Sequence, residues 1–95
     1  MNISTSSNIV TITGNIKSIN DFQEIKSTLD ITKSQHNSMT INIIDSLSIT
    51  SSVIGYFNKL ILKDKINLSM NIGNKKLLEL INDLNLVSIF NAQQA

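Results

Sequence analysis

Along the first 31 residues, the pattern of apolar side chains changes from one typical of strands to one typical of a helix. Residues 2–15 are rich in Ile, Val and Thr and are divided by Ser6-Ser7-Asn8, which predicts two short strands joined by a turn. Ser18 lies three positions before Asp21, the spacing of a capping box, and the apolar residues that follow recur at helical spacing. We therefore expect a β-hairpin and then a helix over about residues 19–31.

Residues 33–38 show no periodicity and contain several turn-forming residues, which predicts an exposed loop. His36, the only histidine of the chain, lies in this segment. A metal ligand or a general base needs partner side chains, and no motif supplies them. We interpret His36 as a solvated loop residue.

Two later segments are predicted to be strands. Residues 40–44 are an apolar run, whereas residues 66–72 alternate strictly between apolar and small polar side chains. A strand buried on both faces would be almost continuously apolar, so the alternation indicates a sheet with one polar face and helices mainly on the other. Between these strands, a second helix is expected to start near Ser51 or Ser52.

The end of the chain predicts a third helix and a short closing segment. Asn74 is a suitable N-cap, apolar residues then recur at helical spacing, and Asn85 suits the left-handed position that ends a helix. Residues 87–90 are expected to close as a strand or to cap the core, and residues 91–95 to fray. The order β-β-α-β-α-β-α, with an optional final β, indicates an α/β domain with a mixed sheet.

Composition and charge narrow the range of functions. The length of 95 residues fits a single domain over residues 1–95, and 8 basic against 7 acidic residues leave no basic run for nucleic acid. The chain has no Cys, no signal-peptide pattern and no apolar stretch of membrane-spanning length. The acidic residues are dispersed, without a nucleophile and base. We expect a cytoplasmic protein that is not an enzyme, with no cofactor, metal, nucleic acid or direct membrane insertion.

The predicted second helix is more apolar than one buried face requires. Val53, Tyr56 and Leu60 lie toward the shoulder of this helix if its other apolar residues face the sheet. One interpretation is an exposed patch that binds a partner. The other is deeper burial under the third helix or under the loop that begins at Asp45.

Two segments resemble one known family. Residues 41–55, INIIDSLSITSSVIG, look like the strand, loop and helix start of STAS domains, named for sulphate transporters and anti-sigma factor antagonists. Residues 77–90, LLELINDLNLVSIF, are similar to the closing helix of the family, and Gly14 stands where the family commonly has Gly after the second strand. The resemblance covers nearly the whole chain, and it implies a STAS-like mixed sheet with helices mainly on one face.

The resemblance also implies a regulated serine. In the antagonist branch of the family, a serine at this helix start is phosphorylated by a serine kinase that is also an anti-sigma factor, and a phosphatase removes the phosphate. The matching residue is Ser52, with Ser51 as the alternative. Thr50 stands where antagonists usually have Asp, and Val53 stands where they have Gly. The resemblance therefore implies a phospho-regulated partner switch. Together with the apolar patch that the pattern of the second helix suggests, the expected partner-binding residues are Thr50, Ser51, Ser52, Val53, Tyr56 and Leu60.

Two alternatives to this switch remain open. The first is that Thr50, Ser51 and Ser52 are simply N-cap candidates, because Ser and Thr are preferred where a helix starts. The second comes from the resemblance, which also fits a constitutive accessory subunit of a membrane transporter of the lipid-transport ABC type. A weak homodimer is a further expectation for the chain.

Overall fold

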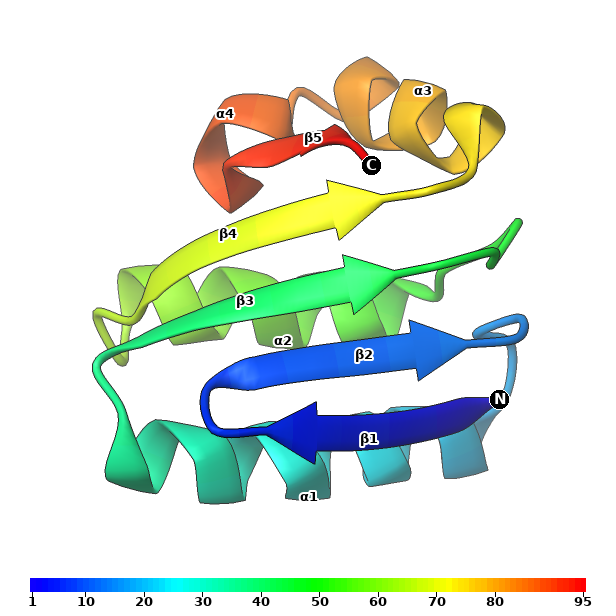
Figure 1. Cartoon of the computed structure of the whole chain (residues 1–95). Helices are drawn as coiled ribbons and strands as arrows, with labels where there is room; N and C mark the ends of the chain where they lie inside the picture. Colours follow the sequence, from blue (N-terminus) through cyan, green and yellow to red (C-terminus); the bar gives the residue numbers. More distant parts are fainter.

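The β-branched segments at the start of the chain form a hairpin. In the computed structural model, which describes residues 1–95, β1 (Asn2–Ser6) pairs antiparallel with β2 (Ile9–Thr13) (Figure 1). Ser7 makes the turn in the left-handed region, with φ of 55°. The turn predicted at Ser6-Ser7-Asn8 is confirmed.

The other strands extend the sheet in the order of the chain. β3 (Ser38–Ile43), β4 (Asn67–Ile72) and β5 (Ala92–Gln94) are parallel to β2, so the sheet has five strands in the order β1-β2-β3-β4-β5. Every parallel step needs a crossover connection, which the helices supply. The expectation of an α/β fold with a mixed sheet is confirmed.

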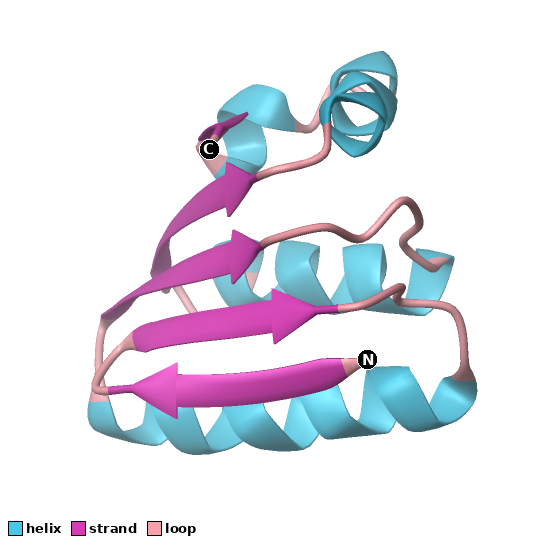
Figure 2. Cartoon of the chain, turned by 45° about the vertical axis from the view of Figure 1, so that its right-hand side comes forward, coloured by secondary structure: helices cyan, strands magenta, loops and turns pink.

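Four helices connect the strands: α1 (Ile19–Gln35), α2 (Ser51–Leu62), α3 (Lys75–Asp83) and α4 (Val87–Phe90). Figure 2 shows α1 and α2 side by side on one face of the sheet, whereas α3 and α4 lie at its β4 and β5 end. None of the four is both long and apolar enough to cross a membrane.

α1 begins where its capping box predicts and ends later than expected. Ser18 accepts a hydrogen bond from the Asp21 amide at 3.0 Å, and Asp21 accepts one from the Ser18 amide at 3.2 Å. The helix continues to Gln35 and β3 begins at Ser38, so the loop predicted over residues 33–38 is limited to residues 36–37, where the C-cap His36 is half-buried. Lys33 lies in the helix and forms a 2.8 Å ion pair with Asp64, a tertiary contact that residues 33–38 do not reveal.

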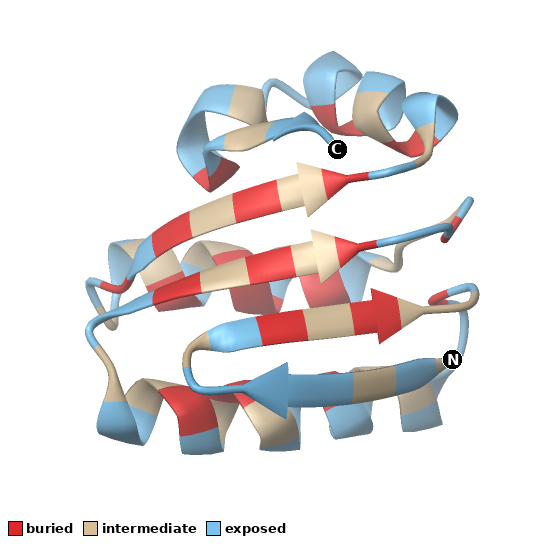
Figure 3. Ribbon diagram, in the orientation of Figure 1, coloured by how far each residue is buried: buried red, intermediate tan, exposed pale blue.

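The core lies between one face of the sheet and the helices. Residues of β3 and β4 alternate between buried and partly exposed, as Figure 3 shows, which confirms the prediction of one polar face. On that open face, Thr40 and Ser69 hydroxyls lie 3.1 Å apart, and Asn71 donates to Asn42 at 2.8 Å. Neighbouring strands therefore satisfy each other's polar groups on the open face.

The last nine residues are part of the fold. Residues 87–90 form one turn of helix whose Phe90 is fully buried, which matches the expectation of a cap over the core. Asn91 then takes a left-handed conformation, with φ of 50°, and turns the chain into β5. β5 pairs with Met70–Ile72, so the prediction that residues 91–95 fray is wrong. The alternative of a final strand at residues 87–90 is wrong, because these residues are helical and the last strand follows them at Ala92–Gln94.

Candidate functional site

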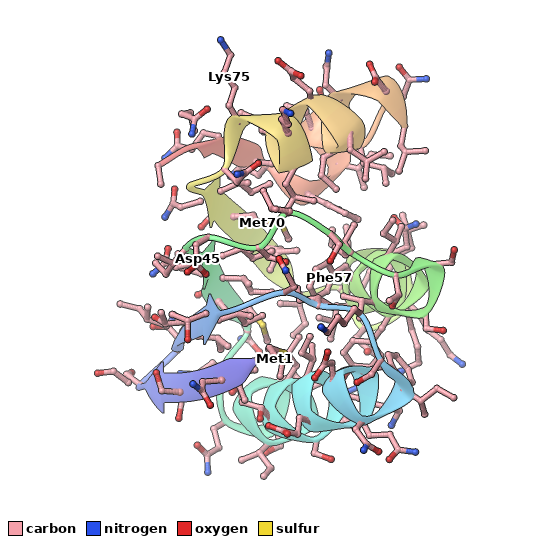
Figure 4. The ribbon with its side chains drawn as sticks, turned by 90° about the vertical axis from the view of Figure 1, so that its right-hand side faces the viewer. Met1, Asp45, Phe57, Met70 and Lys75 are labelled. Atoms are coloured by element: carbon pink, nitrogen blue, oxygen red, sulfur yellow. The ribbon has the colours of Figure 1, made fainter.

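The loops after β2, β3 and β4 lie together at one edge of the sheet. These strands are parallel neighbours, so residues 14–18, 44–50 and 73–74 follow their carboxyl ends side by side and lead into α1, α2 and α3. Figure 4 looks onto this edge. In this view Asp45, in the loop after β3, lies between the labelled residues Met1 and Lys75. We call it the carboxyl edge. Loops that a rigid sheet holds in this way commonly carry binding residues.

Hydroxyl groups lock the loop after β3 against the loop after β2. Ser46 is fully buried; its Oγ accepts from the Ile16 amide at 3.0 Å and donates to the Ser48 carbonyl at 2.7 Å. The Ser48 hydroxyl donates to the Ile16 carbonyl at 2.9 Å.

Two further hydrogen bonds join these loops. The Gly14 amide donates to Asp45 Oδ1 at 2.8 Å, and the Leu47 amide donates to Asn15 Oδ1 at 2.9 Å. The start of α2 is thus held in a fixed position.

One hydroxyl of the predicted cluster caps α2 and two remain exposed. The helix starts at Ser51, as predicted, and Thr50 Oγ1 accepts from the Val53 amide at 3.3 Å. A cap needs only one such oxygen. Ser51 and Ser52 are both exposed in the first turn, where free backbone amides and the helix dipole favour negative charge.

Ser52 also borders a hollow between the starts of α1 and α2. Lys17, Ser18 and Phe22 from the α1 side and Thr50 and Ser52 from the α2 side line a space of about 350 Å³. Lys17 is the only charged residue among those that line the hollow, and the Asp21 carboxylate next to it accepts hydrogen bonds from the Lys17 and Ser18 amides. An anionic group on Ser52 would therefore have a lysine among its neighbours in this hollow.

The shoulder of α2 is buried, which corrects the prediction of an exposed apolar patch there. Val53 and Leu60 have no exposed surface, and Tyr56 is only 5% exposed. Tyr56 packs edge-on against Phe22 of α1, with ring centroids 6.4 Å apart. The alternative of deeper burial is the one that the structure shows, although α1 covers Tyr56 rather than the third helix or the Asp45 loop. Val53, Tyr56 and Leu60 are core residues and cannot form a free partner surface.

The exposed apolar residues at the carboxyl edge come from other positions. Ile44 ends the β3 side of the edge, Leu47 lies in the loop before α2, and Ile19 borders the hollow described above. They are 48%, 59% and 76% exposed, respectively. Sequence patterns did not single out these three residues, because each belongs to a loop or a helix start rather than to an amphipathic repeat.

A second polar cluster joins α1 to α2 away from the carboxyl edge. The hydroxyl of Tyr56 donates a hydrogen bond to the Asp30 carboxylate, and Lys33 lies 3.5 Å from Asp30 and 2.8 Å from Asp64. Burial raises the pKa of Tyr56, and the bond to Asp30 raises it further. Burial opposes ionisation of Asp30, but hydrogen bonds from Tyr56 and Lys26 outweigh it and lower the pKa of Asp30 from 3.8 to about 2.

The lowered pKa of Asp30 predicts loss of stability in acid. Because the folded-state pKa lies below the unfolded value of 3.8, the contribution is complete above about pH 4 and is lost as pH falls toward 2. We expect Asp30→Asn to lower the free energy of unfolding in urea at pH 6 and to make that free energy fall less steeply below pH 4. Glu24→Gln, in the same helix and without an ion pair, is the control and should leave the slope unchanged. Equal slopes for wild type and Asp30→Asn would contradict the prediction.

No group of three or more His, Asp or Glu side chains is close enough to hold a metal ion.

In the comparisons with known proteins, no protein-family model, no curated protein and no solved structure matches this chain.

Proposed function

We propose that this protein is a non-enzymatic protein-interaction module of STAS type, whose carboxyl edge binds a partner and is switched by phosphorylation of Ser52. The partners that the resemblance implies are a serine kinase acting as an anti-sigma factor and a phosphatase. The observation that carries the proposal is the position of Ser52. It is exposed beside a hollow with a lysine, while Thr50 provides the cap of α2.

The geometry around Ser52 supports a modifiable hydroxyl. A phosphate adds a charge of about −2 and three acceptor oxygens. At Ser52 it would lie in the first turn of α2 and near Lys17, so the fold tolerates it. Val53 stands where antagonists of the family have Gly. Its side chain points into the core and does not crowd the exposed Ser52 hydroxyl, so it does not prevent phosphorylation.

The surroundings of Ser52 support a protein partner. Leu47 and Ile19 expose most of their side-chain surface beside the start of α2, and apolar surface of this kind is typical of a protein-binding site. The loop network centred on Ser46 holds the α2 start in place before binding, which lowers the entropy lost on association. A dianion among these apolar side chains would raise the cost of desolvating the surface, and partner binding would weaken.

The arrangement of the elements supports the STAS assignment. The resemblance implies a mixed sheet with helices mainly on one face, and the opening hairpin, the parallel strands after it and the helices between them agree with that expectation. Gly14 has a positive φ of 82°, which suits the glycine that the family commonly has after its second strand.

We expect Ser52→Asp to weaken partner binding about ten-fold or more, because it places a charge where an apolar surface docks. The protein purified from its native cells should carry one phosphate, mapped by mass spectrometry to Ser52. A pull-down with wild type, Ser52→Asp and Ser52→Ala, followed by titration of the recovered partner, measures the effect. Ser51→Asp is the matched control, since Ser51 is also exposed but does not line the hollow.

The outcomes separate the switch from constitutive binding. If Ser52→Asp, Ser52→Ala and wild type bind equally and no phosphate is found, the switch is wrong. Recovery of a transporter ATPase under those conditions would favour a constitutive accessory subunit. A stronger effect of Ser51→Asp would move the acceptor to Ser51.

A further inference from the structure

The sheet of this protein contains no charged residue. All 8 basic and 7 acidic residues lie in helices and loops, and the five strands consist only of apolar, Ser, Thr, Asn and Gln residues. Natural sheets usually protect their edges with lysine, proline or a bulge. This chain has no Pro, and neither edge strand carries a lysine.

The edge formed by β1 is the more open of the two. β1 is a five-residue strand that pairs with β2 on one side only, and four of its residues are exposed. Figure 3 shows it as an almost continuously exposed strand at the margin of the sheet. No loop or helix forms a backbone hydrogen bond with its outer side. The opposite edge, β5, has three residues and contacts both α3 and α4.

The flank of α1 beside this edge extends the uncovered surface. Lys26 and Lys33 are on the flank that meets Tyr56 of α2. At 100° per residue, Glu24, Thr28 and Ile31 fall on the opposite flank. Ile31 is 63% exposed there. α1 lies behind β1, at the same margin of the molecule (Figure 1).

We propose that two copies of this chain associate through their β1 edges, which pair antiparallel across a two-fold axis to form one continuous sheet. Complete overlap of the strand Asn2–Ser6 with its symmetry mate places Ser4 opposite Ser4 and Asn2 opposite Ser6. Every pair is then uncharged, so the strand is complementary to itself. The exposed Ile31 flanks of the two α1 helices approach each other behind the joined sheet.

The absence of charged residues from β1 favours a second copy of this chain as the partner of its edge. In a two-fold pairing the central residue of the strand faces its own counterpart, so a charged residue at the centre would face its own charge. β1 carries no such residue, and its mate supplies an edge of equal length. This inference does not depend on Ser52 or on the proposed switch.

A single cysteine tests both the edge and its register. The chain has no Cys, and directly opposite residues of antiparallel strands have Cα atoms about 4.5–5.5 Å apart, within disulfide range. With oxidised glutathione, we expect Ser4→Cys to form a disulfide-linked dimer. Ser6→Cys, on the same strand and equally exposed, should remain unlinked because it faces Asn2.

Sedimentation equilibrium tests the association without a crosslink. We expect wild type to dimerise and Ser4→Lys, which places two lysines opposite each other, to raise the dissociation constant about ten-fold or more. Gln93→Lys makes the same charge change on the β5 edge and should dimerise like wild type. Circular dichroism checks that each variant is folded. If Ser4→Lys does not fold, the crosslinking of Ser4→Cys tests the proposal instead.

Three results would overturn the proposal. One is a wild-type protein that remains monomeric up to about 1 mM, whether or not it binds a strand of another protein. Another is equal crosslinking of Ser4→Cys and Ser6→Cys. The third is disruption by Gln93→Lys rather than by Ser4→Lys.

Discussion

We expect Gly73→Ala to lower the free energy of unfolding by about 3 kcal/mol or more, because the added methyl group has no space. A Cβ at Gly73 would overlap the Ile44 carbonyl oxygen and lie 3.0 Å from the Ile44 carbonyl carbon. Both are backbone atoms, and the Gly73 amide is tied to the Ile43 carbonyl at 2.8 Å. The carboxyl ends of β3 and β4 cannot separate without breaking this bond. In a domain of this size the midpoint of thermal unfolding should fall by at least about 12 °C.

Gly55→Ala is the matched control for this variant. A Cβ at Gly55 meets no atom within 4 Å, and the residue is exposed in α2. Alanine is favoured over glycine inside a helix by about 0.5–1 kcal/mol, so Gly55→Ala should stabilise the protein. Calorimetry of the two variants measures both effects. A loss below about 1 kcal/mol for Gly73→Ala would mean that β3 and β4 separate more easily than this packing implies.

The local signals of the sequence correctly predicted the hairpin turn and the starts of α1, α2 and α3. The turn at Ser7, the capping box of Ser18 and Asp21, and the N-cap Asn74 are all found. Asn85 takes the expected left-handed conformation, with φ of 60°. Each of these features depends on residues within four positions of one another, so the sequence pattern contains the information that determines it.

Features that depend on distant neighbours were not predicted. The apolar pattern of α2 does not show whether its shoulders face solvent or other helices. Here α1 covers Tyr56, and the fully buried Phe57 packs edge-on against Phe90 of α4, with ring centroids 5.7 Å apart. A helix with neighbours on both flanks needs a wide apolar surface, and α2 has one. The close approach of Gly73 to Ile44 depends in the same way on two separate strands.

The candidate site shows the same division. Its hydroxyl cluster at residues 50–52 was predicted, because Ser and Thr at a helix start have a local meaning. Ser46, the buried centre of the loop network, had no distinguishing pattern, since its partners Ile16 and Ser48 are known only from the fold. Leu47 and Ile19 became candidates once their exposure was known. The helix-start hydroxyls could thus be predicted from the sequence and Ser52 was proposed from the resemblance, whereas the surface around it required the structure.

The chain end is another place where the prediction from sequence was wrong. Residues 91–95 contain only polar residues and Ala, which is typical of a frayed tail. They are ordered because backbone groups of β4 bond to them: the Met70 amide donates to the Asn91 carbonyl at 3.1 Å, and the Ala95 amide to the Ile72 carbonyl at 2.9 Å. Phe90 anchors the turn that brings this segment back to the sheet.

We expect Phe90→Ala to lower the free energy of unfolding by about 3 to 5 kcal/mol, the usual cost of removing a fully buried aromatic ring. The loss includes the contact with Phe57 and detaches β5, so hydrogen exchange of the Ala95 amide should become fast before the rest of the sheet opens. Ile89→Ala, at the exposed neighbouring position, is the matched control and should change stability by less than about 0.5 kcal/mol. If Phe90→Ala costs less than about 1 kcal/mol, α4 does not anchor the chain end, and β5 contributes little to the sheet.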